Sequence, residues 1–283
     1  MSNKTPNNND CHISTSNSHS DNVLVTFDID GTLLIGKNKG GAHLNSFKAA
    51  IYDLFGFKGD VPKYAPGTDI GISKQIIDSI IKSRQIENNS QNNNDTNICS
   101  MSDELLQKFV KKTEDHYSEF FDGEVDIMPG IVESLEGLSN IYNAKIAVCT
   151  GNFKGIALQK IEKAGLSKYF TPYVIGGFGN NFESRTDILK EAHQNAEKVF
   201  GIKFDRFIHV GDSPSDIESA NEIGTTSVLV QTTPFDFNST DYQIPSFVFT
   251  NLKDNYDDFI SVVKTGRATD IYYEKMANKK EYK

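Results

Sequence analysis

The sequence predicts a three-layer α/β fold, in which helices cover both faces of a Rossmann-like parallel sheet and a helical domain is inserted into this core. Two observations support this class. Apolar strand-like segments alternate with amphipathic helical segments through the second half of the chain, as in parallel sheets covered on both faces. Between residues 36 and 126 the pattern is instead helical throughout. The 283 residues are enough for one large core with an insertion.

The chain begins with a polar segment, residues 1–21, that has neither the apolar core of a secretory signal nor the arginine-rich pattern of a transit peptide. We expect this segment to be a disordered tail. The first strand follows in VLVTF, residues 23–27, where apolar and β-branched residues run without a break, as in a buried strand. Directly after it come Asp28 and Asp30, two like charges in nearly the same place.

The inserted helical domain is expected over residues 37–126. Its segment ENNSQNNNDTN, residues 87–97, is polar and of low complexity, and we expect a disordered loop there. The core then comprises residues 22–36 and 127–270, and residues 271–283 are expected to form a C-terminal tail. Helical periodicity within the insertion covers three segments, residues 42–56, 72–84 and 103–121.

The second part of the core starts with a helix near Pro129, a residue favoured in the first turn of helices. Beyond this helix, strands and crossover helices alternate, and in such sheets ligands bind beyond the carboxyl ends of the strands. Strands are predicted at residues 144–150, 173–177, 207–212 and 226–231, and helices at residues 154–166, 184–201 and 216–224.

The composition excludes several kinds of partner. The net charge of −9 leaves no basic surface for nucleic acid or an anionic membrane. No apolar run approaches the roughly 18 residues of a membrane-spanning helix. Cys11, Cys99 and Cys149 lack the spacing of a disulfide or metal site, and we interpret them as reduced thiols of a cytoplasmic protein. The sequence does not distinguish a monomer from a homodimer.

Polar residues gather at the ends of three predicted strands, in DIDGT (28–32), TGN (150–152) and GDSPSD (211–216). If these strands are parallel neighbours, their carboxyl ends converge on one crevice. Four carboxylates would then share the crevice, and two unit charges about 4 Å apart repel by roughly 4 kcal/mol at an effective dielectric constant of about 20. A divalent cation removes this repulsion, and an all-oxygen carboxylate site suits Mg²⁺.

Such a site has the parts needed for phosphoryl transfer. Mg²⁺ keeps several water ligands, which leave room for a substrate phosphate. The backbone amides of Gly151 and Asn152, with a threonine hydroxyl, are suited to the remaining phosphate oxygens. A carboxylate beside a metal-neutralised phosphoryl group is a competent nucleophile, and a second carboxylate two residues later can act as general acid and then as base.

The segments DIDGTL, VCTGN and GDSPSDIESA, in this order and each at a strand end, resemble motifs one, two and four of the haloacid dehalogenase-like hydrolases. The resemblance covers roughly residues 22–232. MPG before motif two and AGLSKYF after it are similar to the phosphatase branch with a helical cap, which is related to phosphoglycolate phosphatases and β-phosphoglucomutases. The resemblance implies that the inserted helices form this cap.

The resemblance also implies roles for the four aspartates. Asp28 would be the nucleophile that becomes an aspartyl phosphate, and Asp30 would be the general acid and base. Asp28, the backbone carbonyl of Asp30 and Asp212 would bind Mg²⁺. Asp216 would orient these ligands or join them.

A phosphate-binding cation is implied as well. The family usually places a lysine in its third motif, whereas this sequence offers Arg185 at a helix start, in a segment that resembles members with arginine there. Lys190 and Lys160 remain alternatives. The other implied phosphate-binding residues are those of motif two, Thr150, Gly151 and Asn152.

Within the cap, PGTDIG places Thr68 and Asp69 where related enzymes carry a substrate-contacting loop. Either residue is equally suited to be the N-cap of a helix, and both interpretations stay open. His43 lies near the first hinge of the cap, and we interpret it as a structural histidine in preference to a substrate contact.

The leading hypothesis is a Mg²⁺-dependent phosphomonoester hydrolase that acts on a small soluble phosphorylated metabolite through an aspartyl-phosphate intermediate. The alternative is a phosphomutase of the β-phosphoglucomutase type. A dehalogenase is disfavoured because Asp30 supplies an acid/base that dehalogenation of this type does not use. A non-catalytic phospho-binding module, such as a receiver domain, needs only about half this length and no helical insertion. Neither nucleic acid nor a membrane is expected as a partner.

Overall fold

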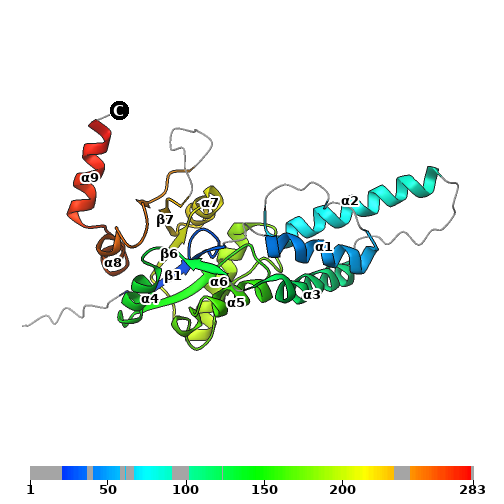
Figure 1. The fold of residues 1–283 in the computed structure, drawn as a ribbon. Coiled ribbons are helices and arrows are strands. Elements are labelled where there is room, and N and C mark those ends of the chain that lie inside the picture. The colour runs from blue at the N-terminus through cyan, green and yellow to red at the C-terminus, as the bar shows by residue number, and fades with distance from the viewer. Residues whose placement is uncertain are drawn as a thin grey trace, which may run out of the picture.

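A parallel sheet with the strand order β5-β4-β1-β6-β7-β8 forms the centre of the computed structural model, which describes residues 21–36, 41–57, 61, 67–90, 102–122, 124–232 and 243–281 (Figure 1). Strand β1 lies between β4 and β6, and its register pairs Phe27 with Val148 on one side and Val210 on the other. The carboxyl ends of these three strands therefore meet at one edge of the sheet. The strands are β1 (Val23–Phe27), β4 (Ala144–Cys149), β5 (Gly176–Gly177), β6 (Arg206–Gly211), β7 (Thr226–Val230) and β8 (Phe247–Phe249).

Helices cover both faces of the sheet, because successive side chains of its buried strands point to opposite sides. On one face, Val25 and Phe27 pack with residues of α4, α5 and α8. On the other face, Leu24, Ala147 and Cys149 pack with residues of α6 and α7. The predicted three-layer α/β fold is therefore confirmed. The covering helices are α4 (Ile131–Ser139), α5 (Lys154–Lys163), α6 (Arg185–Phe200), α7 (Pro214–Glu222) and α8 (Tyr256–Thr265).

Among the described residues, three helices lie between β2 and β3 in the chain and form a separate layer at one side of the sheet; we call them the cap helices (Figure 1). Their apolar residues form a cluster of their own, to which Phe153 and Ile156 at the start of α5 also belong. The rings of Phe47 and Phe153 stack with centroids 6.1 Å apart, so the cap helices pack directly on the core. The cap helices are α1 (Gly41–Phe55), α2 (Asp69–Ser90) and α3 (Asp103–Phe120), and the short antiparallel strands β2 (Leu34–Gly36) and β3 (Val125–Ile127) flank them.

Two predicted segments need correction. Helix α2 continues to Ser90, so residues 87–90 of the predicted loop are helical; the sequence between residues 84 and 90 holds no Gly or Pro that would end the helix. The rest of that loop lies outside the described residues. The predicted C-terminal tail instead forms helix α9 (Asp270–Glu281), because Tyr272 is buried against the rings of Phe247 and Phe249.

Smaller differences concern strand and helix ends. The strand predicted at residues 173–177 contains only Gly176 and Gly177, since these two alone pair with β4 in the described register. The Asn195 side-chain amide donates to the Gly176 carbonyl at 2.9 Å, which occupies an acceptor of this sheet edge. The predicted tail at residues 1–20 lies outside the described residues. None of the helices in the described ranges is long and apolar enough to cross a membrane.

Candidate active site

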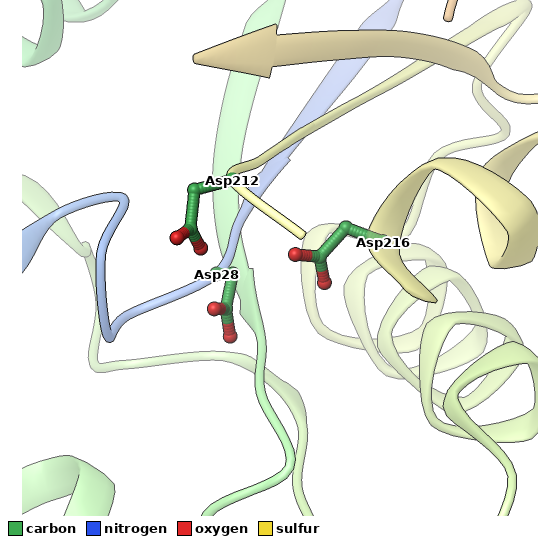
Figure 2. A group of neighbouring side chains, drawn as sticks. All are labelled: Asp28, Asp212 and Asp216. Carbon is green, nitrogen blue, oxygen red and sulfur yellow. The ribbon is translucent and has the colours of Figure 1, made fainter. Parts of the chain in front are cut away.

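Three carboxylates meet at the edge of the sheet where β1 and β6 end. Asp28 directly follows β1, Asp212 directly follows β6, and Asp216 lies in the first turn of α7. Each offers an oxygen within 4.8 Å of the other two, and Figure 2 shows the three side chains gathered around one point. Asp28 and Asp216 are buried and Asp212 is partly buried. The structure thus brings together three of the four predicted aspartates.

A capping box at the start of α7 sets the direction of Asp216. Ser213 is the N-cap: its hydroxyl accepts from the Asp216 amide at 3.4 Å, and the Asp216 carboxylate accepts from the Ser213 amide at 3.1 Å. Pro214 occupies the first turn, where its missing N–H has no cost. The sequence GDSPSD therefore fixes both the helix start and the orientation of its acid.

Motif one contains a glycine because the Asp212 carboxylate lies very close to the backbone there. Gly31 has a φ of 82°, and a Cβ at this position would lie 2.3 Å from Oδ2 of Asp212. Thr32 donates to Asp212 at 3.4 Å, and Thr232, just after β7, donates to the same carboxylate at 3.1 Å. The turn after β1 therefore packs on Asp212 without a side chain between them.

Arg185, the first residue of α6, links two of the three carboxylates. Its Nη2 lies 3.1 Å from Oδ1 of Asp28 and also contacts Oδ1 of Asp216. Of the cations weighed from the sequence, Arg185 is thus the one placed on the predicted nucleophile. Lys190 instead pairs with Asp187 on the surface at 3.1 Å.

The acids of this cluster have pKa values shifted in opposite directions. Burial raises the pKa of Asp28 to about 7. The positive charge of Arg185 opposes this increase, and the negative charges of the neighbouring aspartates add to it. Burial and the Asp216 charge raise the pKa of Asp212 to about 6. Burial would also raise the pKa of Asp216, but Arg185 and the donors His209 and Ser213 hold it well below its usual value. Negative charge at Asp28 and Asp212 is therefore incompletely compensated by the protein itself.

Asp30 belongs to a second network, next to the cluster. Lys160 of α5 donates to both carboxylate oxygens of Asp30 at 2.8 and 2.7 Å and to Oδ1 of Asn152 at 2.9 Å. The Asn152 amide donates to Asp30 at 2.7 Å and to the Thr150 hydroxyl at 2.8 Å. Burial opposes ionisation, yet Lys160 and Asn152 lower the pKa of Asp30. Motif two therefore contacts the predicted acid/base through Asn152.

The two predicted cap residues lie at the junction of α2 with the core. The Thr68 hydroxyl accepts from the Gly71 amide at 3.3 Å, as an N-cap does. Asp69 accepts from the Phe153 amide at 2.7 Å and contacts Nε2 of His43 at 3.0 Å. The Asp69 amide donates to the Gly151 carbonyl at 2.8 Å. Both residues are buried, so the structure places them in contacts between the cap helices and motif two.

A cavity of about 430 Å³ opens beside Asp30, between the core and the cap helices. Its walls include Lys160 from the core and His43 and Tyr117 from the cap helices. The lining contains Asp30 and Gly31 but not Asp28. A larger hollow of about 610 Å³ lies beside β5, and among the described residues none of its lining residues is a predicted site residue. The smaller cavity is therefore the candidate space for a substrate.

Sequence reasoning missed several polar residues that contact these acids. His209 in β6 approaches Asp216 at 3.5 Å and contacts Thr26 of β1 at 2.9 Å. The sequence did contain a signal for this contact, because each of two otherwise apolar strands has one polar residue: His209 in FIHVG and Thr26 in VLVTF. Thr232 follows a strand end, as the motif residues do. The pairing of Lys160 with Asp30 has no local signal, since 130 residues separate them.

The chain belongs to the haloacid dehalogenase-like hydrolases, because the sequence pattern of this family matches residues 23–224. The predicted family is thus confirmed, and with it the prediction of a hydrolase. The chain is 33% identical over 128 residues to a phosphoglycolate phosphatase of Agrobacterium fabrum, covering 45% of this chain and 51%, about half, of that relative. It is 27% identical over 234 residues to a phosphoglycolate phosphatase of Aquifex aeolicus, covering 82% of this chain and 93% of that relative.

Solved structures agree on the fold. CbbY from Rhodobacter sphaeroides, solved in complex with phosphate, is similar with a TM-score of 0.56 at 13% identity, covering 83% of this chain and 96% of that chain. A hydrolase from Pseudomonas syringae is similar with a TM-score of 0.53 at 18% identity, covering 86% of this chain and 99% of that chain. At these identities the likeness shows the architecture alone.

Proposed function

We propose that this protein is a Mg²⁺-dependent phosphomonoester hydrolase that acts on a small phosphorylated metabolite through an aspartyl phosphate at Asp28. One observation carries the proposal: Asp28 lies in a three-carboxylate cluster, contacts Arg185, and stands beside a second network that holds Asp30. The names of the two phosphoglycolate phosphatase relatives support a phosphatase.

The residues present fit a divalent cation. The raised pKa values of Asp28 and Asp212 reflect buried negative charge that Arg185 only partly offsets. A hard cation with oxygen ligands compensates such charge. Asp28, the Asp30 carbonyl and Asp212 would hold Mg²⁺, and Asp216 would orient them or join them. When bound, Mg²⁺ neutralises charge on the phosphoryl group.

The side chains then divide the chemistry. A carboxylate oxygen of Asp28 attacks phosphorus, the bond to the leaving oxygen breaks, and Arg185 faces the charge on the transferred group. Thr150 and the amides of the 150–152 loop bind phosphate oxygens. Asp30 gives a proton to the leaving oxygen and then takes one from the water that cleaves the acyl phosphate. Lys160 and Asn152 lower the pKa of Asp30, which favours the ionised form that the second step requires and disfavours the protonated form that the first step uses.

The cavity beside Asp30 supports a small substrate. Its volume of about 430 Å³ falls at the lower end of the range typical of small-molecule sites. The cap helices form one of its walls, so a bulky phosphoprotein or a duplex would not reach Asp30 in this arrangement. The proposal therefore covers soluble monophosphate esters of small molecules.

Hydrolysis of p-nitrophenyl phosphate tests the proposal. We expect turnover with Mg²⁺, loss of turnover with EDTA and recovery when Mg²⁺ is added back. Ca²⁺ should restore little activity because its looser coordination does not keep octahedral geometry. A panel of phosphorylated metabolites then identifies the substrate, and release of inorganic phosphate separates a hydrolase from a mutase, which returns an isomeric ester. No turnover of any ester with Mg²⁺ bound would reject the proposal in favour of a phospho-binding module.

A further inference from the structure

A polar pair lies inside an apolar layer of the sheet. Thr26 of β1 and His209 of β6 are register partners in the parallel ladder, and both are fully buried. On the same face of the sheet, Leu24, Ala147 and Ala196 belong to an apolar cluster, and β7 places the buried Ser227 opposite His209. A buried polar group destabilises the fold unless it is hydrogen-bonded, so an aliphatic residue would pack here at lower cost. The position of this imidazole therefore calls for an explanation.

Both ring nitrogens of His209 have partners. Nδ1 lies 2.9 Å from the Thr26 hydroxyl, and Nε2 lies 3.5 Å from Oδ1 of Asp216, longer than the about 2.7–3.2 Å of an ordinary N–H···O bond. An ionised carboxylate only accepts, so Nε2 is the donor toward Asp216. The Thr26 hydroxyl carries one hydrogen, which it donates either to Nδ1 of a neutral ring or to the Ile208 carbonyl at 3.2 Å. Thr26 thus fixes the ring in the orientation that points Nε2 at Asp216.

We propose that His209, held by Thr26, is a positioning residue of the active site that aims Asp216 and, through it, Arg185. The inference rests on the proposed function. Oδ2 of Asp216 is already bound by the amide and hydroxyl of Ser213 at 3.1 and 2.6 Å. Oδ1 is shared by Arg185 and His209. His209 therefore fixes the oxygen that anchors Arg185 beside the predicted nucleophile.

Loss of the His209 contact would also affect Asp28, because Arg185 contacts both Asp216 and Asp28. Without the Nε2 donor, the Asp216 carboxylate has one fewer contact to hold its rotation, and Arg185 is free to move toward Asp28. The geometry of the three-carboxylate cluster then loosens. Removal of such an outer partner typically costs about 10–100-fold in metal affinity or activity.

Two variants of His209 separate the roles of its nitrogens. Gln carries an amide nitrogen near the position of Nε2, whereas Asn carries one near Nδ1. We expect His209→Asn, measured on the full metal-free chain by calorimetric titration with Mg²⁺, to weaken binding about 10–100-fold. His209→Gln should retain most of the affinity. With saturating Mg²⁺ and p-nitrophenyl phosphate, kcat should follow the same order while KM changes little.

Two further variants test whether Thr26 acts on Asp216 through His209. Thr26→Val, which keeps the shape and removes the hydroxyl, should weaken Mg²⁺ binding in the same direction, and its effect should not add to that of His209→Asn. His193→Phe is the matched control: His193 lies on the same side of the sheet and stacks on Phe207, and its Nε2 has no partner. We expect His193→Phe to leave Mg²⁺ binding unchanged.

Equal Mg²⁺ affinity in wild type, His209→Asn and His209→Gln, with each variant folded by circular dichroism, would overturn the inference. So would an equal loss in Asn and Gln variants, because a purely structural histidine does not depend on which nitrogen is kept. If His209→Asn fails to fold, Thr26→Val and His209→Gln decide the question by the same titration. A wild type that binds Mg²⁺ but hydrolyses no ester would instead reject the proposed function and leave the binding test intact.

Discussion

Arg185 contacts two acids whose pKa values move in opposite directions, and their other neighbours explain the difference. Asp216 also receives donors from Ser213 and His209, which favour its ionised form. Asp28 is buried and faces other aspartates, so its pKa rises to about 7 despite the same guanidinium. The predicted nucleophile therefore depends on a further positive charge to stay ionised.

The first prediction concerns Asp28 itself. We expect Asp28→Asn to reduce hydrolysis of p-nitrophenyl phosphate to the background rate, because a neutral amide is not a nucleophile toward phosphorus. The melting temperature of the metal-free protein should not fall, since the change removes an uncompensated buried charge. Asp257→Asn, at an exposed position of α8, is the control and should keep full activity. Turnover by folded Asp28→Asn would end the covalent mechanism.

The second prediction concerns pH. Below about pH 7 and about pH 6, protons occupy Asp28 and Asp212 and compete with Mg²⁺. A raised carboxylate pKa means that the folded, metal-free protein binds more protons than the unfolded chain, so these groups make it less stable as pH rises from about 4 to 7. Mg²⁺ reverses this loss. Calorimetric Mg²⁺ affinity should rise roughly 1,000-fold from about pH 5 to above pH 7, about 100-fold from Asp28 and about 10-fold from Asp212.

Melting temperatures measured over the same pH range provide a check on this prediction. The increase in melting temperature caused by Mg²⁺ should grow over the same pH interval in the wild type and should grow less in Asp28→Asn, in which only Asp212 still titrates. A Mg²⁺ effect that is flat between about pH 5 and about pH 8 would show that Asp28 and Asp212 are already ionised throughout.

The third prediction separates the two jobs of Asp30. p-Nitrophenolate leaves without needing a proton, so Asp30→Asn should still form the aspartyl phosphate from p-nitrophenyl phosphate. Hydrolysis of that intermediate needs a base, and the steady-state rate should fall by about 10²–10⁴-fold. Rapid-mix kinetics should show a burst of nitrophenolate, and intact-mass analysis should detect the phosphorylated chain. Absence of both signals with Mg²⁺ bound would assign Asp30 a different role.

At the scale of elements, the start of α5 is capped by residues of other segments. Its N-cap residue Phe153 has no side-chain acceptor of its own. The first amides instead donate to Asp69 of α2 at 2.7 Å, to Asn180 at 2.6 Å and to Glu114 of α3 at 2.8 Å. Carboxylates are favoured at this end of a helix by its free N–H groups and its dipole. Two cap helices therefore stabilise the helix that follows motif two.

The fourth prediction tests these contacts. We expect Asp69→Ala and Glu114→Ala each to lower the free energy of unfolding in urea by about 0.5–2 kcal/mol, the usual cost of a lost N-cap acceptor. Glu104→Ala, at an exposed position in the first turn of α3, is the control and should cost less. We also expect a higher KM in Asp69→Ala, because the Phe153 amide, two residues after Gly151, loses the carboxylate that accepts from it. Stabilities equal to that of the control would mean that water accepts from the Phe153 and Gly155 amides as well as the two carboxylates do.

At the scale of the whole molecule, local patterns predicted the sheet, and distance in the sequence limited the rest. Continuous apolar runs marked β1, β4, β6 and β7, and the polar residues at their ends marked the cluster of Asp28, Asp212 and Asp216. The contacts of Lys160 with Asp30 and of Asp69 with Phe153 join segments 130 and 84 residues apart, which no periodicity encodes. The short strands β2, β3 and β8 have three residues each, too few to show alternation.

Helix α9 covers most of the residues expected to form the C-terminal tail, and its sequence is polar and only weakly amphipathic, yet Tyr272 anchors it. The Tyr272 hydroxyl accepts from the Val248 amide at 3.1 Å, and its ring packs on Phe247 and Phe249. The C-terminal helix is thereby attached to the edge strand β8. Met276 of the same helix also packs against this core, and the pattern of the helix does not reveal either contact.

The fifth prediction follows from this anchor. Tyr272→Ala should lower the free energy of unfolding by on the order of 3 kcal/mol, since a large buried ring leaves a cavity. Tyr273→Ala, whose side chain is exposed next to it, should cost far less. Neither change should alter KM for p-nitrophenyl phosphate, because β8 lies at the far edge of the sheet from β4. Similar melting curves for the two variants would mean that the contact of α9 with β8 does not contribute to the stability of the fold.

The capping of α5 by α2 and α3 also bears on chimeric enzymes. Exchange of caps is an obvious route to new substrate specificity, since the cap helices wall the cavity beside Asp30. A graft from a relative that lacks acids at the positions of Asp69 and Glu114 would leave the Phe153 and Gly155 amides without these acceptors. An unpaired buried amide costs about 1–3 kcal/mol, and here the cost falls next to residues 150–152, the predicted phosphate-binding loop. A transferable cap therefore has to bring these two carboxylates with it.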